Sequence, residues 1–358
     1  MKVRFCSPVK SHMGYAELGR ILINQLVQAG IDVSVHEIPL QVSDADTGAL
    51  GAQAIRLLGA GDSADVNVVN MIPPLFAQYR LPGARNIGCS MFETDRLPEA
   101  WVEQCNQMDA MWVPAEWTRD MFIASGVRVP VSVVGVDAPP TPVHAPVEGP
   151  FRMLSIFQWT ARKNPLALLR AYCAAFDGRT DTVLTLKAHW LEDEQQSAVF
   201  VQRAVNYVLS RIRPRRALPR VEIATRFFSK QEIQQMHAET HAYVSLSHGE
   251  GWGLPAWEAA LAGKPVIHTG WSAPNEFVHE QGQVRCNLSP VYGMEEFSQF
   301  YDTGMNWAEP HLDDAIDKMR DLQANYAIWT RNSRAQRNVI NNRYSMQRRI
   351  EQLRVALR

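Results

Sequence analysis

Apolar and polar positions follow two alternating patterns along the chain. Short apolar runs, typical of buried parallel strands, are separated by stretches with an apolar residue every three or four positions, typical of amphipathic helices. In the first part of the chain this pattern predicts strands at Val3–Cys6, Val33–His36, Val66–Asn70, Asn86–Ser90, Ala110–Val113 and Val131–Val134, and helices at Leu18–Ala29, Glu99–Asn106 and Glu116–Ala124. Alternation of strands and helices at this spacing predicts βαβ units and a parallel sheet.

The pattern is interrupted once and then restarts. Residues 137–150 read D-A-P-P-T-P-V-H-A-P-V-E-G-P, without periodicity and rich in proline, which is typical of a linker between domains. Beyond them the sequence predicts strands at Met153–Phe157, Thr182–Lys187, Val221–Thr225, Ala242–Leu246 and Val266–His268. It predicts helices at Leu166–Phe176 and Pro255–Ala262, a long helix that ends at about Arg211, and a helical tail from about Pro310. We therefore expect two Rossmann-like α/β domains, 1–140 and 151–340, whose parallel sheets face each other across a cleft. A C-terminal helix over 341–358 is expected to pack back on the first domain.

Composition narrows the class of protein. With 358 residues the chain is long enough for two domains, and its formal net charge of −1 does not indicate a nucleic-acid or membrane partner. The cysteines are scattered and form no C-x-x-C pair, so we expect neither a disulfide framework nor a zinc site, but reduced thiols in a cytoplasmic protein. The N-terminus has no long apolar core and no run approaches ~18 apolar residues, so neither a signal peptide nor a transmembrane segment is expected.

The most informative segment is S-L-S-H-G-E-G-W-G-L-P-A-W-E-A-A-L-A-G-K-P-V-I, from Ser245 to Ile267. It predicts a strand, a glycine-rich turn and the start of a helix, with Pro255 in the first helical turn. The turn's glycines let the backbone approach a ligand closely. Free N–H groups at Trp252–Leu254 would point outward with the positive end of the helix dipole, which suits a phosphate group.

Two glutamates, Glu250 and Glu258, bracket this turn. A carboxylate accepts hydrogen bonds at both oxygens, which matches the adjacent hydroxyls of a sugar ring. Carboxylates on either side of a phosphate site can hold two rings, one at each end of a diphosphate. The alternative is that these acids are simply favoured by the helix dipole.

The segment H-G-E-G-W-G-L-P-A-W-E-A-A-L-A-G-K-P-V-I resembles the E-x7-E signature of retaining glycosyltransferases of family 4, which have the two-Rossmann-domain (GT-B) fold. W-S-A-P-N-E-F-V at Trp271–Val278, F-E-T-D-R-L-P-E-A-W and V-P-A-E-W-T-R-D-M-F extend the resemblance. It implies metal-independent transfer of a sugar from a nucleotide-diphosphate co-substrate to an acceptor hydroxyl, with retention of configuration. Glu250 would contact the donor sugar and Glu258 the ribose. The amides expected to face the donor phosphate or sugar are those of Gly251, Trp252, Gly253 and Leu254.

The resemblance also implies an arginine and a lysine at the start of the second domain, which bind the diphosphate. In S-I-F-Q-W-T-A-R-K-N-P, Lys163 takes the lysine position, whereas Gln158 stands where the arginine is expected. Arg162 is the candidate replacement, because a guanidinium binds phosphate oxygens in a fork. The alternative is a solvated Arg–Lys pair in a loop.

Further candidates come from both domains. Gly14, in S-H-M-G-Y-A-E-L-G-R, follows the first strand; the resemblance places this loop over the donor or acceptor, and the alternative is a simple turn. Many family members have a histidine near F-E-T-D-R, where this chain offers Glu93; pairing of the acids there with Arg96 is the competing interpretation. His248 could line the cleft, although loop histidines are more often structural.

The metal interpretation rests on D-A-D at Asp44–Asp46. It lies in a polar loop with no other oxygen ligands nearby, so we interpret it as solvated loop and expect no metal site and no cofactor beyond the co-substrate.

The acceptor is open. Residues 201–230 hold eight basic residues and one acid, and residues 331–358 hold eight arginines and one acid. Such tracts fit nucleic acid, anionic lipid or an acidic glycan, unless their charges pair with acids elsewhere. The acceptor is therefore predicted to be a glycan or a hydroxylated DNA base. The other functional classes are a nucleotide-sugar epimerase, which would change the donor with no acceptor present, and a non-catalytic nucleotide-sugar-binding protein.

Overall fold

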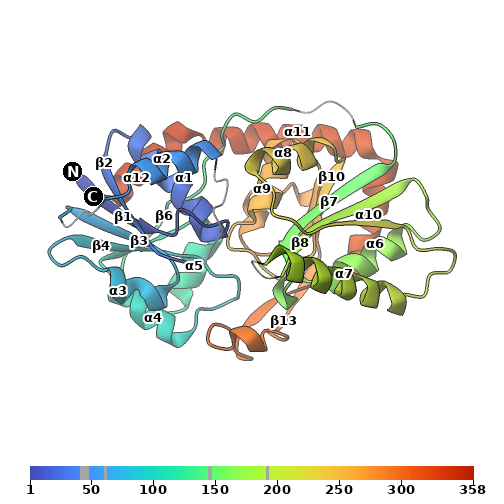
Figure 1. The fold of residues 1–358 in the computed structure, drawn as a ribbon, viewed down its shortest axis with the longest axis horizontal. Helices are drawn as coiled ribbons and strands as arrows, with labels where there is room; N and C mark the ends of the chain where they lie inside the picture. The colour runs from blue at the N-terminus through green and yellow to red at the C-terminus, as the bar shows by residue number, and fades with distance from the viewer. Residues whose placement is uncertain (41–47, 60–62, 144–146, 191–192) are drawn as a thin grey trace. The chain divides into compact units, whose positions relative to one another are not determined.

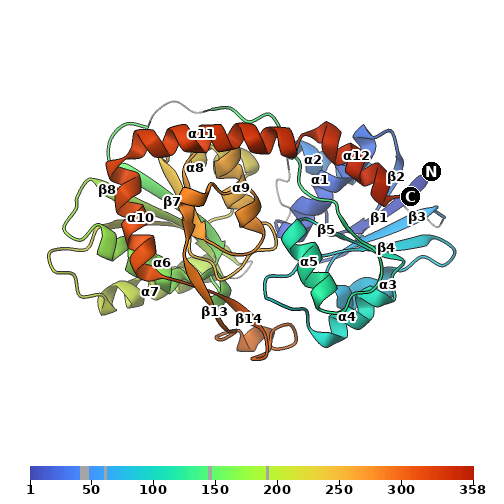
Figure 2. The ribbon, with the colours of Figure 1, turned by 180° about the vertical axis from the view of Figure 1, so that it is seen from behind.

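The structure is a computed structural model that describes residues 1–40, 48–59, 63–143, 147–190 and 193–358. It divides into two compact units, one of Met1–Pro139 with Asn342–Arg358 and one of Pro140–Asn341 (Figures 1 and 2). Each unit has its own hydrophobic core and its own six-stranded sheet.

Unit 1 contains a parallel sheet in the order β2-β1-β3-β4-β5-β6. Its strands are β1 (Lys2–Ser7), β2 (Asp32–Glu37), β3 (Val66–Asn70), β4 (Arg85–Cys89), β5 (Ala110–Val113) and β6 (Val131–Val133). Its helices are α1 (Gly14–Gln28), α2 (Gly48–Arg56), α3 (Phe76–Tyr79), α4 (Glu99–Asn106), α5 (Glu116–Ala124) and α12 (Met346–Ala356). The last of these packs on α1, places Leu353 in the core of the unit, and is held by the Arg349 Nε–Val136 O hydrogen bond of 2.9 Å.

Unit 2 repeats the architecture with the order β12-β11-β10-β7-β8-β9. Its strands are β7 (Phe151–Gln158), β8 (Thr182–His189), β9 (Arg220–Ala224), β10 (Ala242–Ser245), β11 (Val266–Thr269) and β12 (Gln283–Val284), with an antiparallel pair β13 (Cys286–Pro290) and β14 (Asn306–Pro310). Its helices are α6 (Pro165–Ala175), α7 (Glu194–Arg211), α8 (Lys230–Ala238), α9 (Leu254–Leu261), α10 (Leu312–Ala324) and most of α11 (Tyr326–Arg343).

Two helix-flanked parallel sheets confirm the predicted fold class of two Rossmann-like domains. In unit 2 the strand order turns at β7 and β10, which are parallel neighbours although far apart in the sequence. The carboxyl ends of parallel neighbours meet at one edge of the sheet, and a ligand binds where the strand order reverses. The turn after β7 and the glycine-rich turn after β10 are therefore brought together.

The remaining fold-level expectations concern membranes, metals and thiols. No helix in the described ranges is long and apolar enough to cross a membrane. Within the same ranges no group of three or more His, Cys, Asp or Glu side chains is placed to hold a metal ion, whereas Asp44–Asp46 lie outside the described residues. All five cysteines are free thiols, and burial raises the pKa of Cys89 to about 12.

Candidate functional site

Two cations and one carboxylate converge at the carboxyl edge of the unit 2 sheet. The Lys163 Nζ lies 2.6 Å from both carboxylate oxygens of Glu250, and the Arg162 Nη1 lies 3.3 Å from the Glu250 Oε2. The same Arg162 nitrogen donates to the Gly249 carbonyl at 2.8 Å. The structure thus brings together three of the predicted site residues from two turns, 87 and 88 positions apart in the chain.

The turn after β7 carries both cations, and its backbone is fixed by hydrogen bonds. Residues Ala161–Lys163 form a 3-10 turn that ends at Asn164, whose backbone is left-handed at φ 49° and whose side chain caps α6 by accepting from the Ala167 amide. The Arg162 carbonyl accepts hydrogen bonds from the His248 amide at 2.8 Å and from the Ser247 hydroxyl at 3.1 Å. These bonds join the two turns through the backbone, so the position of the cations does not depend on the ion pairs alone.

Glu250 is a buried anion, with its side chain 11 % exposed. Burial by itself would raise the pKa of its carboxyl group, but the positive charges of Lys163 and Arg162 outweigh burial and lower that pKa from 4.5 to about 2. The backbone amide of Glu250 donates to the Ser272 Oγ at 3.0 Å. Glu250 is therefore ionised at neutral pH and is fixed at both its side chain and its backbone.

The helix that follows, α9, begins at the glycine turn. Its N-cap is Gly253, which has a left-handed φ of 86° and provides no side-chain cap. A Cβ at this position would lie 3.1 Å from the Pro274 Cγ, a tight contact, so glycine is favoured by both conformation and space. Gly253 and Leu254 remain partly accessible. The first-turn amides therefore form an uncapped, positively polarised helix end next to Glu250, which can bind an anion.

Glu258 lies on the second turn of α9 with its side chain 32 % exposed. Its Oε2 lies 3.6 Å from the Nε2 of His237, a buried residue of α8. Glu258 thus lies on α9 whereas Glu250 lies in the turn before it, and the Glu258 carboxylate is partly exposed, as a ribose-binding role would require.

Two predicted donor-site residues point into the protein. His248 is 1 % exposed, with Nδ1 2.8 Å from the Ala308 carbonyl oxygen, Nε2 3.2 Å from the Tyr292 hydroxyl, and its ring stacked on Trp307. Burial lowers the pKa of His248, so the ring is neutral at pH 7. The Trp252 side chain is buried against Trp257, so only the backbone of Trp252 can serve a ligand. The stack of His248 on Trp307 of β14 was not apparent from the sequence, which did not predict this strand.

Gln158, the departure from the expected arginine, is exposed at the end of β7, and its Nε2 donates to the Trp190 carbonyl at 3.2 Å. It does not contact Glu250. The guanidinium of Arg162, by contrast, lies at the cluster, where its Nη1 contacts Glu250.

The predicted residues of the first domain all lie in unit 1. Gly14 is exposed at the start of α1, where an added Cβ would meet open space. The neighbouring Tyr15 hydroxyl contacts the Ser90 Oγ at 2.9 Å and donates to the Met91 carbonyl, which attaches this helix start to the loop after β4. Glu93 is half-buried on that loop. Asp95 pairs with Arg96 at 3.4 Å.

Sequence reasoning missed Ser272. This residue has φ 64° and ψ −166°, a backbone conformation that is almost exclusive to glycine. It is 2 % exposed, and its hydroxyl accepts the Glu250 amide. Backbone strain of this kind persists only where the surroundings fix it, and it often marks a functional site. Ser272 lies in the segment Trp271–Val278 of the family resemblance, but a serine does not indicate this backbone conformation, so the strain becomes visible only in three dimensions.

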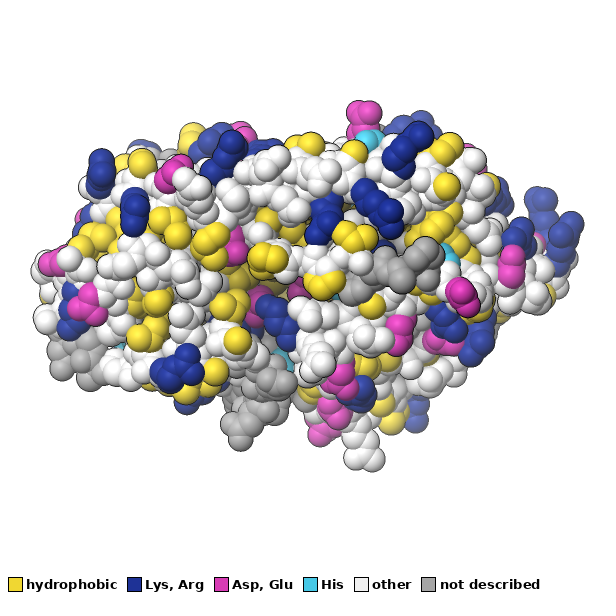
Figure 3. Space-filling model, turned by 90° about the horizontal axis from the view of Figure 1, so that it is seen from above, with side chains coloured by type: hydrophobic (Ala, Val, Ile, Leu, Met, Phe, Trp, Pro, Cys, Tyr) yellow, Lys and Arg dark blue, Asp and Glu magenta, His cyan; other side chains and the backbone are white. Residues whose placement is uncertain are grey.

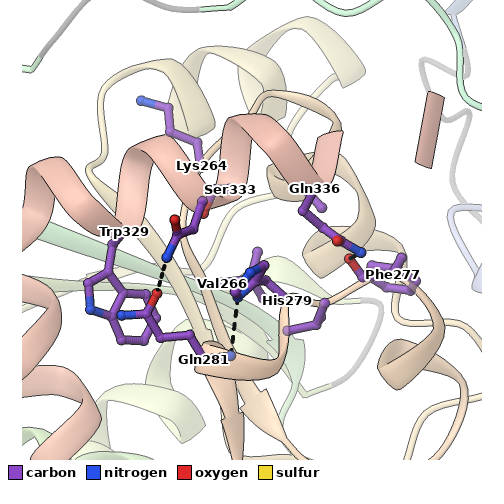
Figure 4. A pocket seen from close by; sticks show the side chains of 12 residues that line it. Lys264, Val266, Phe277, His279, Gln281, Trp329, Ser333 and Gln336 are labelled. Atoms are coloured by element: carbon purple, nitrogen blue, oxygen red, sulfur yellow. Dashed lines mark hydrogen bonds between the residues drawn. The ribbon is translucent and has the colours of Figure 1, made fainter. Parts of the chain in front are cut away.

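A separate pocket beneath α11 is not a ligand site. It is lined by side chains such as Lys264, Phe277, Gln281, Trp329 and Gln336 (Figure 4), but its volume is about 10 Å³. That volume holds one water molecule at most. Two of the hydrogen bonds drawn there, Asn332 Nδ2 to Gln281 Oε1 at 2.9 Å and Gln336 Nε2 to the Phe277 carbonyl at 3.2 Å, attach α11 to the unit 2 core.

The chain matches no protein-family model and no curated protein. It is similar in fold to several solved structures. HepE from Anabaena, solved with UDP and glucose and with UDP-glucose, aligns with a TM-score of 0.66 at 14% identity, over 100% of this chain and 99% of HepE. The E. coli structure of trehalose-6-phosphate bound with UDP-2-fluoro glucose gives a TM-score of 0.66 at 11% identity, over 100% and 99% of the two chains.

TarM from S. aureus, solved with fondaparinux, α-GlcNAc-glycerol and UDP, aligns with a TM-score of 0.59 at 12% identity. The alignment covers 82% of this chain and 55% of TarM, so the chain spans about half the length of that protein. At these identities the comparisons establish the GT-B fold. Activity, substrate and partners must be argued from the residues.

Proposed function

We propose that this chain is a glycosyltransferase that moves a sugar from a nucleotide-diphosphate sugar to an acceptor hydroxyl. The observation that carries the proposal is the convergence of Lys163 and Arg162 on Glu250, beside the uncapped start of α9. Structures of the same fold, described above, hold UDP or UDP-sugars. A buried anion that is held by two cations next to an anion-binding helix end matches a donor that carries both sugar hydroxyls and a diphosphate.

The chemistry follows from where charge develops. Breaking the bond between the anomeric carbon and the diphosphate builds negative charge on the phosphate oxygens. Lys163, Arg162 and the α9 amides stabilise that charge as fixed donors, and such donors each contribute about 2.7–4 kcal/mol in comparable oxyanion sites. Glu250 anchors both cations before the donor binds, and its carboxylate is placed to accept from sugar hydroxyls near the reacting carbon.

The finer features belong to the same proposal. Lys163, Arg162 and the helix end supply the positive charge that a metal would otherwise supply, so the transfer is metal-independent. The E-x7-E resemblance supports retention of configuration and a ribose-binding role for Glu258. A glycan is the proposed acceptor, because the comparisons give no support to a hydroxylated DNA base. Gly14 and Glu93 are proposed to serve the donor or acceptor from unit 1.

The test is a panel of UDP-, GDP- and ADP-sugars that are scored for thermal stabilisation of the full chain. A donor at a hundred times its Kd should stabilise the native protein by about 2.7 kcal/mol. The Glu250→Gln variant is measured with the same panel. Its control is Glu280→Gln, which changes an exposed acid outside the cluster. Release of nucleoside diphosphate that requires an acceptor supports a transferase. Conversion of the sugar with no acceptor present would show an epimerase, and stabilisation without turnover would show a binding protein.

A further inference from the structure

One face of α7 carries a regular row of exposed side chains. Val199, Arg203, Tyr207 and Arg211 follow one another at intervals of four residues, so they lie along one side of the helix. Val199 is 49% exposed and Tyr207 is 62% exposed, and both arginines are exposed. The Arg211 guanidinium lies over the Tyr207 ring at 5.2 Å. Cations and apolar groups therefore alternate along about 18 Å of helix, at a rise of ~1.5 Å per residue.

The row continues into a loop with a fixed backbone. The Asp177 carboxylate accepts from the amides of Arg215 at 2.9 Å, Arg216 at 3.0 Å and Ala217 at 3.2 Å, and the Gly178 amide donates to the Ala217 carbonyl at 2.8 Å. Arg213 and Arg215 are exposed on this loop. The Arg215 backbone is thus held by the Asp177 carboxylate, which reduces the conformational entropy that this residue loses on binding.

These arginines differ from the other basic residues of the two basic tracts, residues 201–230 (the first tract) and 331–358 (the second tract). In the second tract, Arg337, Arg349 and Arg354 donate to carbonyls of Leu261, Val136 and Ala29, which attaches α11 and α12 to the fold. In the first tract, Arg220 pairs with Glu222 and Arg226 with Glu232. By contrast, Arg203 and Arg211 of α7, and Arg213 and Arg215 of the loop after it, form no ion pair with an acid of the described ranges. Figure 1 shows α7 in unit 2. On the face that Figure 3 draws, Lys and Arg side chains are scattered, and several lie together at the right-hand end.

The other end of the row opens into a groove of about 420 Å³, which is within the range of small-molecule sites. Its lining includes Val199 and Arg203 of the row, so the two surfaces are continuous. Trp190 stacks on Phe200 with ring centroids 4.1 Å apart and gives the groove an aromatic wall. Asp193, Gln195 and Gln196 add a carboxylate and two carboxamides, which can accept from and donate to hydroxyl groups.

We infer that α7 binds an acidic oligosaccharide, with a hydroxyl-rich ring in the groove and its carboxylate or sulfate groups along the arginines. Guanidinium groups bind such planar or tetrahedral anions in a fork. A bilayer would require one continuous apolar face, whereas here a cation interrupts the apolar residues at every second position of the row. The carboxylate and carboxamides of the groove favour the hydroxyls of a sugar ring, and binding of a nucleic acid is an outcome of the test. The inference deepens the proposed function, since it names the chemistry of a glycan partner.

The test measures binding without any nucleotide sugar. The probes are an oligogalacturonate, a heparin oligosaccharide and the methyl ester of the oligogalacturonate, which keeps the rings and loses the charge. We expect one or both acidic probes to bind at low salt with a steep salt dependence, and the ester to bind far more weakly. Arg203→Gln/Arg211→Gln/Arg213→Gln/Arg215→Gln should weaken binding by about tenfold or more, from four exposed charge contacts. Tyr207→Ala, at an exposed position that the fold does not need, should weaken it a few fold.

The matched control removes the same charge from other exposed positions, Arg128, Arg331, Arg348 and Arg358, and should leave affinity within about twofold. Equal loss in test and control variants would overturn the inference, because the attraction would then be a property of net charge. So would the absence of binding by both acidic probes, or tighter binding of single-stranded DNA or anionic vesicles through the same arginines. None of these results changes stabilisation by the donor, so failure here is distinct from failure of the proposed transferase.

Discussion

Replacing Glu250 with Gln keeps the shape of the side chain and removes its charge, which makes it the sharpest probe of the cluster. Lys163 and Arg162 then remain largely buried without their anion. The pKa of Glu250 falls from 4.5 to about 2 on folding. At about 1.36 kcal/mol per pKa unit, the ionised carboxyl contributes about 3 kcal/mol to the free energy of unfolding at pH 7. Loss of one partner of a buried ion pair is known to cost a similar amount, about 3–5 kcal/mol.

The stabilisation by the ionised Glu250 depends on pH, and the lowered pKa determines the direction of the change. A carboxyl group with a lowered folded-state pKa stabilises the protein above its unfolded pKa and loses that contribution as the pH falls toward the folded value. The difference between wild type and Glu250→Gln should therefore shrink from about 3 kcal/mol at pH 7 to about 1.4 kcal/mol at pH 3.

The assay is hydrogen exchange of the α9 amides across a urea series, which reports the opening of unit 2. Glu280→Gln, an exposed substitution, serves as the control and should show no difference at either pH. A Glu250→Gln variant that is as stable as wild type at pH 7, or a difference that stays constant in acid, would refute the description of Glu250 as a buried, ion-paired anion.

Three other expectations follow from the same structure. Lys163→Ala should lower turnover in a donor-saturated assay by about 10²–10³-fold, whereas the exposed Lys10→Ala should not, and near-normal turnover of Lys163→Ala would exclude its role. Gly253→Ala should cost about 1–2 kcal/mol of stability through its left-handed φ and its contact with Pro274, and an unchanged urea midpoint would contradict this. Burial lowers the pKa of Lys187 from 10.5 to about 8, so Lys187→Met should stabilise the protein by up to about 3 kcal/mol at pH 7. That gain should disappear as the pH rises from about 8 to 10.5, since the wild type gains stability there; a gain that persists at high pH would contradict the burial argument.

Local patterns predicted most of the elements of the sheets. The apolar run at Val66–Asn70 and the amphipathic stretch at Glu116–Ala124 coincide with β3 and α5, because each is defined by a short, local periodicity. The strand, glycine turn and helix around Gly253 were also visible, since glycine and proline mark such a turn. Helix α8 and the pair β13–β14 were missed, because α8 is mostly polar, β13 is largely exposed and β14 is a short run of five residues that contains polar positions.

The contacts within the candidate site could not be predicted from the sequence, for a different reason. The ion pair between Lys163 and Glu250 exists because β7 and β10 are neighbours, and only the strand order of the sheet shows this. His248 was a candidate ligand contact because it lies in a loop. Its ring is enclosed by Tyr292 and Trp307, which are distant in the sequence, so this contact could not be predicted from the local pattern. The strained backbone of Ser272 likewise depends on its neighbours in space.

The most direct test of the account is a crystal structure of the chain with a nucleotide-diphosphate sugar that stabilises it. We predict the diphosphate at the start of α9, within hydrogen-bonding distance of the Leu254 amide and the Lys163 Nζ, with Glu250 facing the sugar and Glu258 the ribose. A donor bound at any other place, or a diphosphate that contacts neither Lys163 nor the α9 amides, would contradict it.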